Sequence, residues 1–204
     1  ATEGHVIAFL VEADHVTVAH QVRNLRVSGT PMTIGMELPT HPPYGASLAA
    51  WATPAERDRW LSELPEELRG RYDKALSAAR RRGYTIGLNV LADLRHQELA
   101  SLIRAAETSG RGSRLGDLAD ALTDELLHRE EWILASVSAG RTYDVSHLDS
   151  PVVGPGGRVE LVLSLVPVPS SQTGASTTAL GATLASTTAQ LSAALGGTAR
   201  RRGA

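Results

Sequence analysis

Residues 34–45 read IGMELPTHPPYG, and ASLAAW follows at residues 46–51. Three prolines and two glycines within the first twelve positions disfavour a regular helix or a central strand. We therefore predict an ordered loop. The six residues after it favour a helix that begins near Gly45. The loop thus presents the polar side chains of His41 and Tyr44 just before the start of a helix.

The sequence before this loop has the pattern of a β-hairpin. Residues 6–11 are nearly all apolar, residues 12–14 can turn, and residues 15–23 are rich in β-branched side chains. These features are typical of two antiparallel strands joined by a short turn. Residues 25–27 are expected to continue the sheet, and the Ser-Gly-Thr-Pro stretch at 28–31 to end it.

The sequence after the loop predicts two helices and a strand. Thr53, Pro54 and Glu56 make a strong helix start, because threonine caps, proline suits the first turn and the glutamate can close a capping box. A second helix is predicted over residues 66–82, where apolar side chains recur at helical spacing. Gly83 is its natural terminator, and residues 84–90 are expected to form a strand.

The middle of the chain changes character, with helical stripes over residues 91–106 and 115–133. We expect two helices there, within an insertion at about 89–137. It can be a packed helical hairpin, an oligomer contact or a lid over a pocket. β-Structure is then expected to return over residues 142–148 and 159–166, joined by a turn at 155–157.

The C-terminal stretch, residues 170–197, is biased toward Ala, Ser, Thr and Gly, as a linker would be. Its leucines nevertheless recur at spacings of 4, 7 and 4, which favours a helix with a heptad-like apolar stripe. These leucines are Leu180, Leu184, Leu191 and Leu195. Residues 198–204 are expected to be a basic tail.

Composition limits the possible classes of protein. With 204 residues and 42% hydrophobic side chains, the chain can bury one core, and we predict one domain over residues 1–197. The absence of cysteine excludes disulfides and thiolate chemistry. A net charge of −2 provides no global attraction to DNA or to acidic membranes. No apolar run reaches the roughly 20 residues of a membrane span, and we expect a cytoplasmic protein.

Three blocks of sequence resemble the effector domain of the IclR family of transcriptional regulators. GMELPTH at 35–41, with Gly45 and the Ala-Trp pair at 50–51, resembles the family's G-x-x-L-P-L-H block. LSAARRRGY at 76–84 resembles L-x-x-x-R-x-x-G-Y. SPVVGPGGRV at 150–159 resembles the hairpin A-P-V-F-D-x-x-G-x-V. The order of the blocks, and the spacing of the first two, also fit.

The resemblance implies an α+β fold, with a GAF-like antiparallel sheet flanked by helices. It implies a domain that senses a small organic or aromatic acid, forms homodimers or homotetramers, and has no enzymatic activity. DNA would be bound through an N-terminal winged helix-turn-helix domain. This chain starts without Met and enters a predicted strand almost at once, so we expect that domain to be absent from it.

The loop before residue 46 is the first candidate for the ligand site. A helix start presents unpaired N–H groups and a partial positive charge, which attract a carboxylate. Gly45 and Ala46 would let the ligand approach the backbone, and His41 and Tyr44 would add hydrogen bonds. The alternative is that the prolines only stiffen a turn and that His41 is structural.

His147 and Ser164 are the second candidate. The resemblance places both on strands that face the pocket. Ser164 is a polar residue within a very apolar strand, so it needs a hydrogen-bond partner. That partner can equally be backbone or water.

Other chemistry finds little support in the sequence. The histidines lack the spacing of metal ligands, no G-x-S-x-G motif indicates a hydrolase, and the glycines at 154–157 lack the lysine of a phosphate loop. We therefore predict no metal, no cofactor and no catalytic residue. Two alternatives remain: a GAF-like sensor without a DNA-binding output, and an enzyme whose site has no known motif.

Overall fold

The computed structural model describes residues 4–23, 32–88, 133–167 and 169–197. The elements follow in chain order: β1 (Gly4–Val11), β2 (His15–Val22), β3 (Glu37–Pro39), α1 (Ala46–Ala49), α2 (Pro54–Ser62), α3 (Glu66–Arg82), β4 (Thr85–Leu88), β5 (Thr142–Val153), β6 (Val159–Pro167), β7 (Ser171–Thr173) and α6 (Gly174–Ala194).

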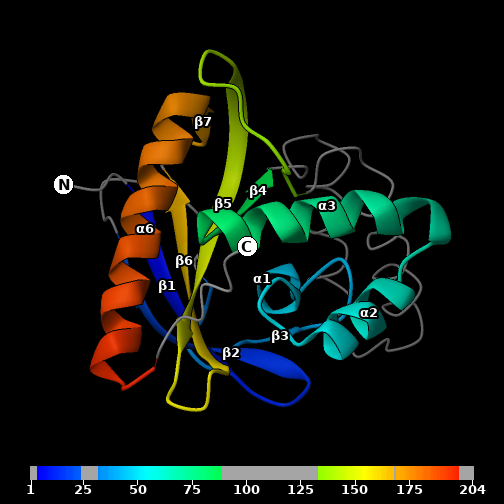
Figure 1. The fold of residues 1–204 in the computed structure, drawn as a ribbon. Helices are drawn as coiled ribbons and strands as arrows, with labels where there is room; N and C mark the ends of the chain where they lie inside the picture. The colour runs from blue at the N-terminus through cyan, green and yellow to red at the C-terminus, as the bar shows by residue number, and fades with distance from the viewer. Residues whose placement is uncertain (1–3, 24–31, 89–132, 168, 198–204) are drawn as a thin grey trace, which may run out of the picture.

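The strands form one antiparallel sheet in the order β3-β2-β1-β6-β5-β4, and β7 pairs with β5. Helix α6 lies on one side of this sheet, and α1, α2 and α3 lie on the other (Figure 1). We call these two sides the α6 face and the α1 face. The predicted class, α+β with an antiparallel sheet flanked by helices, is confirmed.

The α6 face is closed by direct packing of the helix on the central strands. Leu184 lies at the centre of the contact, and a Cβ atom at Gly181 would overlap the ring of Tyr84, so the helix approaches the sheet closely at this glycine. The other buried members of this core come from β4, β5, β6 and the segment before β5. They are Ile86, Leu134, Tyr143, Val145, Leu148 and Leu165.

The predicted helix over 180–195 exists, but its predicted apolar stripe is only half right. Leu184 is buried, whereas Leu191 and Leu195 are exposed. The face of α6 turned to the sheet continues instead through Thr188 and Ser192. Small hydroxyl side chains can be buried there because they hydrogen-bond to their own helix and to β5.

The α1 face carries a second apolar cluster, which includes Phe9, Val162 and Leu48 of α1. Helices α2 and α3 pack together beside α1 around Trp60 and Tyr72. The start of α2 is the predicted capping box: the hydroxyl of Thr53 accepts from the Glu56 N–H, and the Glu56 carboxylate accepts from the Thr53 N–H. The capping box therefore fixes the residue at which α2 begins, and with it the position of the helices on the α1 face.

Four features differ from the sequence expectations. β3 lies within residues 34–45, which were predicted to be a loop, and it pairs with β2 as an edge strand, where a proline is tolerated. β5 is longer than predicted and runs through Pro151, which lies beyond the end of β4, where its missing N–H interrupts no pairing on that side. Ile133, expected in a helix, forms a β-bridge with Gly87 instead. β7 was not predicted, because its three residues resemble the low-complexity stretch that follows.

Several predicted segments lie outside the described residues. They are the strand continuation at 25–27, the helical stripes between 89 and 132, and the basic tail at 198–204. Among the residues that the structure does describe, no helix combines the length and apolar character needed to cross a lipid bilayer.

Candidate functional site

The loop at residues 40–45 is held on both sides by hydrogen bonds. The hydroxyl of Thr40 donates to the carbonyl of Asp14 in the β1–β2 turn, at 2.9 Å. From the other side, Nε1 of Trp60 donates to the carbonyls of Thr40 and Tyr44, at 2.9 and 3.1 Å. The predicted ordered loop is thus confirmed over residues 40–45, and the indole of Trp60 is its main support, a role that the sequence did not indicate.

Gly45 is required by the closure of this loop. Its φ of 66° lies in the left-handed region, and a Cβ atom there would overlap the carbonyl oxygen of Thr40. The helix that follows, α1, has only four residues, so its dipole is much weaker than the sequence argument assumed. The case for a carboxylate at Gly45 and Ala46 is weakened accordingly.

His41 and Tyr44 lie edge to face, with ring centroids 6.2 Å apart. His41 is exposed, and its Nδ1 donates to the carbonyl of Pro42 at 3.0 Å. Tyr44 is partly buried, and that burial raises the pKa of its hydroxyl. Of these two predicted ligand residues, Tyr44 is the one sheltered from solvent.

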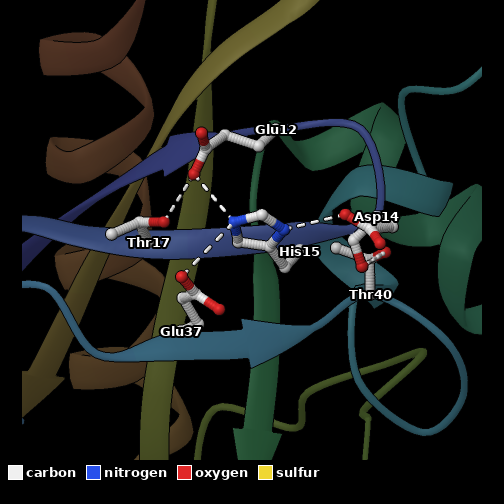
Figure 2. A network of polar contacts seen from close by, with 6 residues as sticks. All are labelled: Glu12, Asp14, His15, Thr17, Glu37 and Thr40. Carbon is white, nitrogen blue, oxygen red and sulfur yellow. Dashed lines mark hydrogen bonds and ion pairs between the residues drawn. The ribbon is translucent and has the colours of Figure 1, made fainter.

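A second polar group lies next to this loop, around His15 at the start of β2 (Figure 2). Its imidazole lies 2.8 Å from Asp14, 2.9 Å from Glu12 and 3.9 Å from Glu37. The hydrogen bond to Asp14 raises the pKa of His15, and the same pair lowers the pKa of Asp14. No group of His, Asp or Glu side chains within the described ranges is arranged to hold a metal ion.

The second candidate site lies on the α1 face, in the centre of the sheet. Cross-strand register aligns Thr85 of β4 with Asp149 of β5, and Asp149 with Ser164 of β6. Their chain neighbours Ile86, Leu148 and Leu165 belong to the core under α6. Because side chains alternate along a strand, these three residues point to the α1 face. We call Thr85, Asp149 and Ser164 the polar row.

The polar row is buried and incompletely hydrogen-bonded. Thr85 and Ser164 are 2% and 4% exposed, and the Asp149 side chain is 16% exposed. Oγ1 of Thr85 and Oδ1 of Asp149 have no hydrogen-bond partner among the residues that the structure describes. Buried polar groups of this kind are rare in folded proteins and are often functional.

His147 lies two residues before Asp149 on the same face of β5. Its Nε2 is 3.7 Å from Oδ2 of Asp149. The imidazole lies across Gly87 of β4, where a Cβ atom would overlap Cε1 of the ring. The missing side chain at Gly87 therefore leaves room for His147 beside the polar row.

The structure brings the two halves of the predicted site to the same side of the sheet. His147 and Ser164 lie on the α1 face, and α1, which follows the loop, packs on that face through Leu48. Sequence reasoning missed Thr85 and Asp149. Asp149 could have been found, because it is a carboxylate two residues from His147 and therefore on the same face of the predicted sheet.

Comparison with known proteins rests on the fold alone. No family model matches the sequence, and no curated protein matches it. Solved structures do match: the repressor BlcR of Agobacterium tumefaciens covers 97% of this chain at 17% identity, with a TM-score of 0.54. The IclR protein of Thermotoga maritima covers 96% at 13% identity, with a TM-score of 0.55. The chain has the fold of IclR-family transcriptional regulators.

The IclR-type likeness concerns mainly the C-terminal part of those regulators. This chain spans 62% of the length of the Agobacterium and Thermotoga proteins. A separately solved single domain of an IclR-family regulator, described as residues 129–302, is covered to 87% and matches 95% of this chain, at 13% identity with a TM-score of 0.57. The IclR-type fold here therefore corresponds to one domain of a larger protein in those relatives.

Proposed function

We propose that this chain is the effector-binding domain of an IclR-type transcriptional regulator. The observation that carries the proposal is the buried polar row on the α1 face. It lies within a fold that this chain shares with solved IclR-type regulators. A small molecule would bind between the sheet and the loop at residues 40–45. The role is regulatory and not catalytic, in a cytoplasmic protein.

The proposed binding residues fall into two groups. His147 and Ser164 lie on the sheet and are the stronger candidates, because they adjoin the buried oxygens of Thr85 and Asp149, which have no partner within the described part of the chain. His41, Tyr44, Gly45 and Ala46 belong to the loop and to the start of α1. The sequence resemblance predicts an organic or aromatic acid as the effector, and we retain that class as the starting point for a search.

Regulation would act through the rest of the protein. The chain would form homodimers or homotetramers, and the effector would bind one quaternary arrangement more tightly than another, because only such a difference shifts an equilibrium. An N-terminal winged helix-turn-helix domain would then bind or release DNA. A GAF-like sensor without DNA output would share the binding step and lack this last one.

A thermal-shift screen of organic and aromatic acids tests the binding step. A ligand at 100 times its dissociation constant stabilises the folded state by about 2.7 kcal/mol, which raises the melting temperature measurably. Ser164→Ala should then weaken the binding of a hit roughly 2- to 10-fold, the effect of one hydrogen bond. The control is Ser186→Ala, on the exposed side of α6.

Two results would contradict the proposal. One is a broad screen without any stabilising compound, and the other is a hit whose affinity is the same in wild type and Ser164→Ala. The DNA-binding step is tested separately by a gel-shift assay on the whole regulator with and without the hit. No change in DNA affinity would favour the GAF-like sensor without DNA output.

A further inference from the structure

The carboxylate of Asp149 has one oxygen that the described residues leave unused. Oδ2 faces His147, with Nε2 at 3.7 Å, beyond normal hydrogen-bond length. Oδ1 is buried without a donor among the described groups. A carboxylate removed from water in this way costs stability unless a donor or a cation comes to it. What Asp149 lacks is therefore a hydrogen-bond donor, preferably a charged one.

The neighbours of Asp149 suit the same kind of group. Thr85 and Ser164 flank it on the adjacent strands and face the same way. With strands roughly 4.8 Å apart, the three side chains span about 10 Å, the size of a small ligand's polar end. Hydroxyls can accept hydrogen bonds as well as donate them, so Asp149 and a neighbouring hydroxyl can accept from one compact donor.

Two arginines of the helices on this side are engaged elsewhere. Arg57 pairs with Asp73 at 2.7 Å, and Arg80 donates to the carbonyls of Ala50 and Ala52. The polar row itself carries a negative charge at Asp149. A carboxylate placed directly against it would meet a like charge at short range, whereas a cation would be attracted.

We propose that the effector carries a protonated amine, which binds the polar row by donating to Asp149 and to the adjacent hydroxyl of Thr85, while Ser164 binds another polar atom of the ligand. An ammonium group has three donors and no acceptor, and two of its N–H groups can reach acceptors on two adjacent strands at once. An amino acid would satisfy both this site and the acidic effector that the sequence predicts. The inference rests on the proposed function and narrows its ligand class.

The test compares ligands that share one skeleton and differ in charge. One set is phenylalanine, phenethylamine and 3-phenylpropionate, and the other is 4-aminobutyrate, butylamine and butyrate. Thermal shift and calorimetric titration are carried out on the folded chain. We expect members that carry an amine to raise the melting temperature in at least one set, and the matching acid without nitrogen to bind at least 10-fold more weakly.

Substitutions in the polar row test which side chains bind the amine. Asp149→Asn removes the charge and keeps the shape, and it should weaken amine binding on the order of 10- to 100-fold, the effect of losing a charged hydrogen-bond partner. Thr85→Val should weaken it less, by several-fold. Asp144→Asn is the matched control: this carboxylate also has a buried oxygen that lacks a partner among the described residues, but it lies five residues away on β5, opposite Ser171. Its change should leave amine affinity unaltered.

The outcomes separate this inference from the proposed function. If an acid without nitrogen binds and the amines do not, the amine inference is wrong and the sensing function stands. Equal amine affinity in wild type, Asp149→Asn and Thr85→Val would also overturn it, as would two sets in which no amine binds. The sensing function fails if the broad acid screen is empty as well, or if a hit binds wild type and Ser164→Ala equally well.

Discussion

The two faces of the sheet differ in how far their buried polar groups are hydrogen-bonded. On the α6 face, the hydroxyl of Ser150 donates to the carbonyl of Gly83 at 2.8 Å and lies 2.7 Å from the hydroxyl of Thr188. Ser192 there accepts from the N–H of Val153 at 2.9 Å. On the α1 face, Thr85 and Asp149 each keep a buried oxygen with no partner among the described residues.

This difference separates groups that support folding from groups that are available to a ligand. A buried hydroxyl with a partner contributes to stability, while one without a partner costs stability. Proteins retain such costs where function requires them. The α6 face is therefore structural, and the α1 face is where we place binding. Substitutions on the two faces should differ in sign as well as in size.

The largest expected effect is on the α6 face. Leu184→Ala removes a side chain that is 7% exposed and packs on the sheet, so it should lower the free energy of unfolding by about 2–5 kcal/mol. Urea denaturation followed by circular dichroism measures this. Leu191→Ala is the control in the same helix: its side chain is 41% exposed, and the change should cost less than about 0.5 kcal/mol. Equal losses in the two variants would mean that Leu191 is packed as well as Leu184, as the predicted heptad-like stripe requires.

Ser150→Ala should have the next largest effect. It leaves the carbonyl of Gly83 and the hydroxyl of Thr188 without the partner they share, so the free energy of unfolding should fall by about 1–3 kcal/mol. The same denaturation assay applies. A loss within experimental error would mean that this hydrogen-bonded group does not support the fold, and the contrast between the faces would disappear.

Thr85→Val should have the opposite sign. Valine keeps the shape of threonine and removes a buried hydroxyl that has no partner in the described chain. The free energy of unfolding should stay the same or rise by up to about 1 kcal/mol. A loss as large as that of Ser150→Ala would show that the hydroxyl has a structural partner. The polar row would then not differ from the hydrogen-bonded hydroxyls of the α6 face.

Local patterns in the sequence were enough to predict much of this fold. The capping box at Thr53, the terminator at Gly83 and the alternation along 159–166 each depend on neighbours a few residues away. The face of α6 turned to the sheet could not be predicted in this way. It depends on hydrogen bonds between β5 and the hydroxyls of Thr188 and Ser192, which only the tertiary fold creates.

The candidate site was predicted in part for the same reason. Ser164 could be found because it interrupts an apolar strand. Thr85 could not, because its burial and its place beside Asp149 depend on strands 64 positions apart in sequence coming into register. The loop candidates were found from their prolines and glycines, but Gly45 turns out to be needed for the closure of the loop itself.

The smallest expected effect concerns pH and lies outside both faces, at His15. Its pKa is raised above 6.5 by the hydrogen bond to Asp14 and by the nearby carboxylates, so its contribution is complete below about pH 6.5 and is lost as the pH rises through the raised pKa. The pKa of Asp14 is lowered below 3.8, so its contribution is lost only at more acidic pH. Asp14 is exposed and His15 is only partly buried, so water screens the pair and the effect is small.

Melting temperatures from pH 5 to pH 9 measure this contribution. The wild type should lose slightly more stability on the alkaline side than His15→Gln, which has no titrating group there. Parallel curves for the two proteins would mean that the network around His15 (Figure 2) does not contribute to stability.

The central claim is that a ligand binds the α1 face and not the α6 face. The most direct test is to add a stabilising compound from the screen to isotope-labelled protein and to record which backbone amide signals move. We predict the largest changes at Thr85, Asp149 and Ser164, with little change at Thr188 and Ser192. Changes centred on α6, with the polar row unmoved, would contradict the account.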